Sequence, residues 1–118
     1  MLDGCKFIAA FGFACGLAAA AQAADPGNAA GHAVFQTWCA GCHADSPLAP
    51  GTVALKAVRE PDAVVLEQRT DLSPALIRTM VRRGFGGMPS FRRVEISAAE
   101  LDALVAYLGG SSGAGAGQ

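Results

Sequence analysis

The sequence lacks an excess of charge of either sign. Nine Lys and Arg residues nearly balance ten Asp and Glu residues, which leaves a net charge of −1. A nucleic-acid-binding patch requires clustered basic residues, and an acidic interaction tail requires a run of carboxylates. The balanced charge indicates neither.

Large aromatic side chains are scarce after the first 23 residues. The rest of the chain has only Phe35, Trp38, Phe85, Phe91 and Tyr107. A single small domain with so few large side chains buries a thin core, and such domains often need a metal or cross-links. We therefore expect a bound group to complete the core.

Residues 1–23 are predicted to be a secretory signal peptide. Lys6 precedes an apolar run over residues 7–21, and Ala21-Gln22-Ala23 has the pattern of a cleavage site. The run is shorter than the roughly 20 strongly apolar residues of a membrane span. An uncleaved anchor and lipidation at Cys15 are the alternatives. Export would make the protein periplasmic.

The domain boundaries follow from this segment and from the composition of the C-terminus. We expect residues 24–110 to form one domain. Residues 111–118 are rich in Gly, Ala and Ser, so we expect a disordered tail there. Cleavage after Ala23 would remove Cys5 and Cys15 and leave only Cys39 and Cys42, so no separate structural disulfide could form.

The two remaining cysteines belong to the pattern Cys39-Ala40-Gly41-Cys42-His43, which is typical of covalent attachment of a c-type haem. Cysteines three apart on a helical turn share a side and can each bond one vinyl group. His43 follows directly and can bind the iron as its proximal ligand. We therefore predict one covalently bound haem c with its iron.

The second axial position of the iron has three candidate ligands. Met88 lies in a glycine-flanked loop and precedes Pro89, which fixes the backbone there. Met80 lies on the apolar face of a predicted helix, where methionine usually fills gaps. His32 lies on the first predicted helix. The loop position favours Met88, although simple burial of a packing methionine remains an alternative.

Capping residues and apolar periodicity predict three helices. The first covers residues 26–38, after Asp25 and Pro26. The second has Ser73 as N-cap and ends at Gly84. The third has Ser97 and Glu100 as a capping box and ends at Gly109.

Between these helices we expect less regular structure. Residues 44–61 contain three prolines and should form a loop that wraps one haem edge. We expect residues 61–68 to form a short helical piece and residues 85–94 to form an irregular loop. No strand pattern is present, so the fold class is all-α.

Four features together resemble a class I cytochrome c: the Cys39 to His43 motif, Gly31 four residues before Phe35, Met88-Pro89, and Tyr107-Leu108 in the last helix. The resemblance implies a small fold whose N- and C-terminal helices cross around one covalent haem. Gly31 and Phe35 would then meet the last helix near Leu104 and Tyr107.

The resemblance also implies a ligand set and a hydrogen bond behind it. His43 and Met88 would be the axial ligands, and Cys39 and Cys42 the attachment points. A proline carbonyl would accept from Nδ1–H of His43. Pro50 matches best and Pro47 second, although the family usually has Gly-Pro where this chain has Ala49-Pro50.

A narrower resemblance rests on residues 82–91, Arg-Arg-Gly-Phe-Gly-Gly-Met-Pro-Ser-Phe. This stretch is similar to the cytochrome subunits of flavocytochromes of the p-cresol methylhydroxylase and eugenol hydroxylase type. It implies a flavoprotein dehydrogenase subunit as the electron donor. The arginines at 82, 83, 92 and 93 could dock that partner, form a solvated face or anchor a haem propionate. Arg59 and Arg69 are further propionate candidates.

Three function classes can be weighed on these features. Filled axial positions favour a one-electron carrier that is not itself an enzyme and passes electrons to a downstream carrier or oxidase. Another dehydrogenase or an oxidase could equally be its partner. A haem enzyme or gas sensor needs an open distal site. A thiol redox or zinc module needs a thioredoxin-like fold or further metal ligands.

Overall fold

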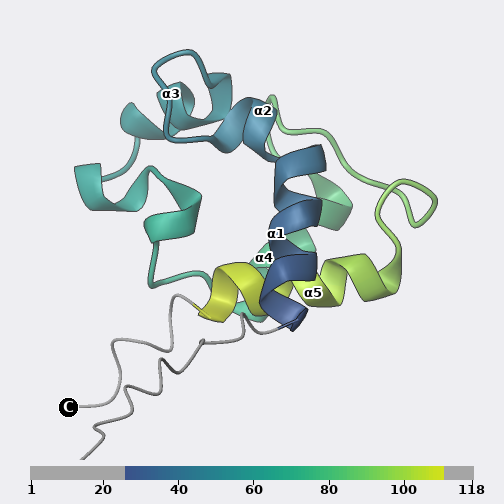
Figure 1. The fold of residues 1–118 in the computed structure, drawn as a ribbon. Coiled ribbons are helices and arrows are strands. Elements are labelled where there is room, and N and C mark those ends of the chain that lie inside the picture. The colour runs from purple at the N-terminus through teal and green to yellow at the C-terminus, as the bar shows by residue number, and fades with distance from the viewer. Residues whose placement is uncertain (1–25, 111–118) are drawn as a thin grey trace, which may run out of the picture.

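The structure, a computed structural model, describes residues 26–110. The signal peptide and the tail predicted at residues 1–23 and 111–118 lie outside the described residues. Two 13-residue helices, α1 (Pro26–Trp38) and α5 (Ala98–Gly110), cross in close contact (Figure 1). The described chain forms helices and turns without a β-strand, which confirms the all-α class.

The crossing depends on Gly31. This residue is buried, and a Cβ atom placed on it would overlap the carbonyl of Ala103 and the Cβ atom of Tyr107 in α5. One turn later, Phe35 is fully buried, and its ring centroid lies 6.1 Å from that of Tyr107. The predicted meeting of Gly31 and Phe35 with the last helix is therefore confirmed.

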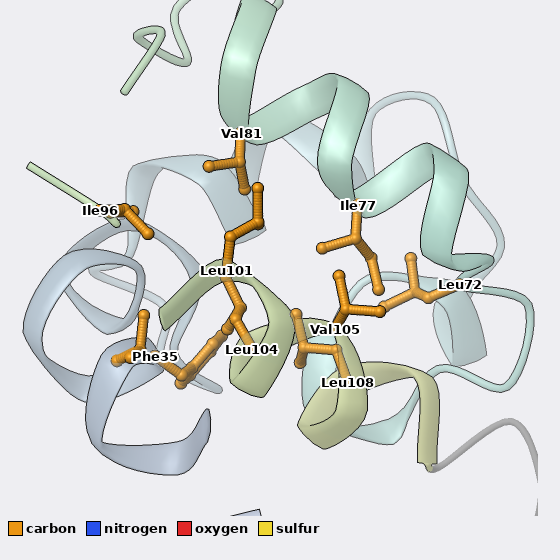
Figure 2. Close-up of a cluster of buried hydrophobic side chains, with 10 residues drawn as sticks. Phe35, Leu72, Ile77, Val81, Ile96, Leu101, Leu104, Val105 and Leu108 are labelled. Carbon is orange, nitrogen blue, oxygen red and sulfur yellow. The ribbon is translucent and has the colours of Figure 1, made fainter. Parts of the chain in front are cut away.

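The third core helix is α4 (Pro74–Arg83), which packs against α5. Figure 2 shows the apolar side chains of α5 between Ile77 and Val81 of α4 and Phe35 of α1. Burying these side chains is the main stabilising contribution to the fold. The buried apolar cluster comprises Val34, Phe35, Leu72, Ile77, Val81, Ile96, Leu101, Leu104, Val105 and Leu108.

Two of the predicted helix starts are formed as expected, while Asp25, the predicted N-cap of the first helix, lies outside the described residues. The Ser73 hydroxyl accepts from the Leu76 backbone N–H at 3.2 Å. At α5, the Glu100 N–H donates to the Ser97 hydroxyl at 3.2 Å, and the Ser97 N–H donates to the Glu100 carboxylate at 2.8 Å. This reciprocal pair is a capping box, which satisfies two backbone donors that a helix start otherwise leaves free.

Three predicted boundaries need correction. The stretch 44–61 is not all loop, because α3 (Pro50–Lys56) lies within it. The expected helical piece at 61–68 is two 3₁₀ turns, η1 (Pro61–Ala63) and η2 (Leu66–Gln68). The last helix runs through Gly109 to Gly110. A four-residue helix, α2 (Ala40–His43), carries most of the haem-attachment motif.

Two polar contacts fix the segment between α3 and α4. The Tyr107 hydroxyl donates to the Glu67 carboxylate and so joins α5 to η2. Burial, followed by the bond to Glu67, raises the pKa of Tyr107 to about 12. Arg69 is buried and binds the Asp71 carboxylate through two nitrogens, at 2.6 and 2.7 Å.

Replacing Gly31 by alanine should destabilise the protein by about 1–3 kcal/mol, because the added methyl meets backbone and must separate α1 from α5. Thermal unfolding would measure the change. Gly110→Ala is the matched control, since a Cβ there meets nothing within 4 Å and alanine favours helix. Equal melting temperatures for Gly31→Ala and the unchanged protein would contradict the close crossing.

Candidate functional site

The attachment motif begins where α1 ends. The Cys39 N–H donates to the Phe35 carbonyl at 2.8 Å, and the His43 N–H donates to the Cys39 carbonyl at 2.8 Å. Cys39 is partly buried against the apolar cluster, whereas Cys42 is exposed, and both thiols are free. The first cysteine is thus placed by the core, and the second lies one turn further on.

The Cys39 thiol does not have the lowered pKa of a redox-active cysteine. Burial, together with the neighbouring Cys42, raises the pKa of Cys39 to about 11. Thiol–disulfide enzymes require the opposite, a lowered pKa that provides the thiolate. Within residues 26–110, no three His, Cys, Asp or Glu side chains gather in a way that could hold a metal ion such as zinc.

His43 is positioned as a neutral ligand with one ring nitrogen turned inward. It is partly buried, and burial lowers its pKa, which favours the neutral imidazole that metals require. Its Nδ1 atom is buried without a hydrogen-bond partner. A ring whose Nδ1 faces protein leaves Nε2 to bind a metal.

The predicted hydrogen bond from His43 to Pro50 is absent from this structure. Pro50 is the first residue of α3, where a carbonyl points along the helix toward its later turns. Pro47, the second choice, does not accept this bond either, because Nδ1 has no partner. The residue that does lie against the ring is Gly51.

Gly51 forms a cradle for His43 that sequence reasoning missed. A Cβ atom on Gly51 would lie 2.7 Å from the Cys42 carbonyl oxygen, 2.8 Å from Cε1 of His43 and 3.0 Å from Nδ1. The next residue, Thr52, is almost fully buried, and its hydroxyl donates to the Ala44 carbonyl at 2.8 Å. The start of α3 is thereby held against α2, and the imidazole packs on bare backbone.

The Met88 loop is a tight hairpin. The backbone of Phe85 and that of Met88 exchange two hydrogen bonds, of 3.1 and 2.9 Å. Gly84 and Gly86 have φ values of 67° and 57°, which favour glycine. A Cβ on Gly84 would also overlap the Met88 carbonyl. Both backbone polar groups of Met88 are therefore fixed, which an irregular loop would not achieve.

The chain beyond the hairpin returns to the attachment motif. The Phe91 N–H donates to the Val81 carbonyl at 2.8 Å. The Phe91 ring meets the Trp38 ring edge-on, with centroids 5.9 Å apart. Trp38 directly precedes Cys39. Phe91, three residues after Met88, therefore contacts the residue next to the motif.

The other two ligand candidates lie elsewhere. His32 is exposed on α1, where it contacts the Tyr107 ring edge-on at 5.4 Å and lies 3.3 Å from the Gln36 amide. It precedes Cys39 by seven residues, or about 10 Å along a helix. Met80 is partly buried within α4, so its backbone belongs to a regular helix and not to a loop that could extend over the haem.

The arginines near Met88 have different surroundings. Arg82 is partly buried and its guanidinium donates to three backbone carbonyls, so of the four arginines it is the one bound to the protein's own backbone. Arg92 pairs with Glu95 at 3.3 Å. The side chains of Arg83 and Arg93 are exposed, and neither side chain makes an ion pair or a hydrogen bond with the described residues. Arg69 is bound to Asp71, while Arg59 is exposed.

The residues present fit a haem c. The donor set consists of two free thiols one turn apart and a neutral imidazole held by close packing. Cys39 and Cys42 would hold the vinyl carbons, and His43 would hold the iron. Met88 would offer its thioether from the hydrogen-bonded hairpin. Thioether and imidazole are both established ligands of haem iron.

Comparison with known proteins identifies a family for most of this chain. Residues 26–108 match the family model described as cytochrome c oxidase, cbb3-type, subunit III. The match covers most of the chain and includes the motif and Met88. Searches of curated proteins and of solved structures found no match.

Gly51→Ala should disturb His43, because the added methyl cannot fit without moving the imidazole or the start of α3. We expect about 1–3 kcal/mol of destabilisation from overpacking, together with altered haem absorption. Gly41→Ala is the matched control in the motif itself, since its Cβ meets nothing within 4 Å. Identical spectra and unfolding curves for both variants would refute the cradle.

Proposed function

This chain belongs to the c-type cytochrome family described as cytochrome c oxidase, cbb3-type, subunit III, and from that premise we propose its ligands, donor and location. Family membership establishes the coarse function. The chain carries one covalently bound haem c with its iron and is an electron-transfer protein that is not catalytic by itself. Bound haem supplies the ferric/ferrous couple.

We propose that His43 and Met88 are the axial ligands, with Cys39 and Cys42 as attachment points. The observation that carries this assignment is the hairpin, which fixes both backbone groups of Met88. A ligand on a preorganised backbone loses little entropy on binding. With both axial positions filled, no open site is left for a substrate. The same two residues would stay bound in both oxidation states, so electron transfer would need little rearrangement of the chain.

The proposed electron donor is a flavin-dependent, phenol-oxidising dehydrogenase subunit. Support comes from the resemblance of residues 82–91 to the cytochrome subunits of such flavocytochromes. Exposed Arg83 and Arg93 beside the hairpin offer unpaired positive charge to an acidic partner surface. Electrons would pass onward to a downstream carrier or oxidase.

A second candidate function is favoured by the family description, which names an oxidase subunit. The chain would then deliver electrons directly to an oxidase, and its donor would be another dehydrogenase. Stopped-flow reduction by a purified flavin-dependent, phenol-oxidising dehydrogenase would separate the two. Rapid reduction supports the first function, and reduction no faster than by an unrelated flavoprotein contradicts it.

The proposed location is the periplasm, reached through the signal peptide at residues 1–23. Attachment of c-type haem outside the cytoplasm in bacteria supports export. Among the described residues, no helix has the length and apolarity needed to span a membrane. Mass spectrometry of the mature chain would show cleavage after Ala23, and an intact N-terminus would contradict this part of the proposal.

Met88→Ala should open the second axial position. Because methionine ligation raises the reduction potential, we expect the potential to fall by roughly 0.1–0.3 V within the ~0.8 V range that axial ligands span. Ferrous protein should then bind carbon monoxide rapidly. Met80→Ala, which also truncates a partly buried methionine, is the control and should bind none. The reverse result would assign Met80 as the ligand.

Charge reversal at Arg83 and Arg93 should slow reduction by the partner at low salt by about tenfold or more, because steering by opposite charge is lost. The salt dependence of the rate should also flatten. Lys56→Glu on α3, which Figure 1 shows on the other side of α1 from the segment after α4, controls for charge. Equal slowing by Lys56→Glu would rule out a local docking surface.

A further inference from the structure

Arg82 has an unusual environment for a cation. It is partly buried, and its guanidinium makes no ion pair within the described residues. One nitrogen, Nη1, donates to the carbonyls of Phe91 and Ile96 at 3.1 and 2.8 Å. The other, Nη2, donates to the carbonyl of Ser97 at 3.3 Å. Backbone oxygens alone therefore satisfy the charge, so the side chain is committed to this place.

The three carbonyls lie at the two ends of one segment. Phe91 is where the chain leaves the Met88 hairpin, and Ile96 and Ser97 are where it reaches α5. Ile96 is fully buried in the core, so the far end of the segment is fixed. Between these ends, Val94 is 83 % exposed and belongs to no helix. Arg82 thus closes a short loop at its base.

The same base holds the hairpin against α4. The Phe91 N–H bonds to Val81, the residue before Arg82, and the Phe91 carbonyl bonds to Arg82 itself. Without the guanidinium, one backbone bond would remain to tie residue 91 to α4. Charge-assisted hydrogen bonds are about twice as strong as neutral ones, so the arginine supplies much of this attachment.

We infer that Arg82 is a positioning residue for Met88: by tying the chain after the hairpin to α4 and to the start of α5, it limits how often the Met88 sulfur leaves the iron. This inference rests on the proposed ligation by Met88. A thioether is a weak ligand, and its occupancy depends on how far its loop can move. A tied loop keeps the sulfur near the iron, whereas a released loop opens the site to other ligands.

The fraction of protein with an open site can be measured with added imidazole. An external ligand that binds only the open state has an apparent Kd equal to its intrinsic Kd divided by the open fraction. In Arg82→Gln, the ferric haem-loaded protein should bind imidazole roughly tenfold more tightly than the unchanged protein. The ferric absorption band of sulfur-to-iron ligation should weaken in parallel.

Two further variants separate positioning from general stability. Arg82→Lys keeps the charge but cannot fork across three carbonyls, so its imidazole affinity should fall between those of Arg82→Gln and the unchanged protein. Arg78→Gln is the matched control one turn earlier on α4. Arg78 also reaches α5, through a 2.6 Å ion pair with Asp102, but it does not touch the segment after Met88. Its imidazole affinity should be unchanged.

A double variant tests the link to Met88 directly. In a Met88→Ala background the site is already open, so adding Arg82→Gln should no longer change imidazole affinity. A tenfold change that persists in this background would overturn the inference, as would an equal effect of Arg78→Gln. If Arg82→Gln does not accumulate, Arg82→Lys is compared in both backgrounds by the same criterion.

Failure of the ligand assignment gives a different result. If Met88 does not bind the iron, Met88→Ala alone leaves imidazole affinity and the sulfur-to-iron band unchanged. The inference about Arg82 then falls with the assignment. If Met88→Ala has the expected effect but Arg82→Gln has none, the proposed ligands stand and only the positioning role of Arg82 is wrong.

Discussion

The close crossing of α1 and α5 at Gly31 is the contact on which the rest of the structure depends. Because Gly31 has no side chain, the backbone of α1 reaches Ala103, and Phe35 is buried one turn later. The Phe35 carbonyl then accepts from the Cys39 N–H. The attachment motif is therefore placed by helix packing, and it does not depend on a flexible loop for its position.

The two proposed ligands are held by different physical means. His43 is held by packing, since its ring lies on Gly51 while Thr52 ties α3 to the chain after α2. Met88 is held through its backbone, by the hairpin and by the segment that Arg82 secures. Close packing blocks displacement of the ring by steric overlap, whereas a hydrogen-bonded segment moves as soon as a few bonds break. The methionine side is consequently where a variant can most readily change ligation.

Features determined by neighbours in sequence were predictable from the residues themselves. Of the contacts between distant residues, the crossing at Gly31 was predicted only through the family resemblance, and those at Thr52 and Arg82 were not predicted. Ser73, Ser97 and Glu100 cap their helices through contacts within three residues, so sequence alone located them. The helix α3 was missed because Pro50-Gly51 is typical of a turn, and the contact that secures its start joins Thr52 to Ala44, just after α2. Arg82 and Arg83 are chemically identical neighbours. Only the tertiary structure shows that the first binds three carbonyls and the second faces solvent.

Partner choice is the property that the fold determines least. A helix crossing, two thiols, an imidazole and a thioether serve a flavoprotein-linked cytochrome and an oxidase-linked cytochrome equally well. The difference must lie on the surface, and the exposed charged and apolar groups near the hairpin are Arg83, Phe85, Arg93 and Val94. These residues lie on the same stretch of chain as Met88 and the carbonyls that Arg82 binds. A partner that docks there would contact the segment that holds Met88, so the proposed ligation by Met88 links recognition of the partner to the redox properties of the iron.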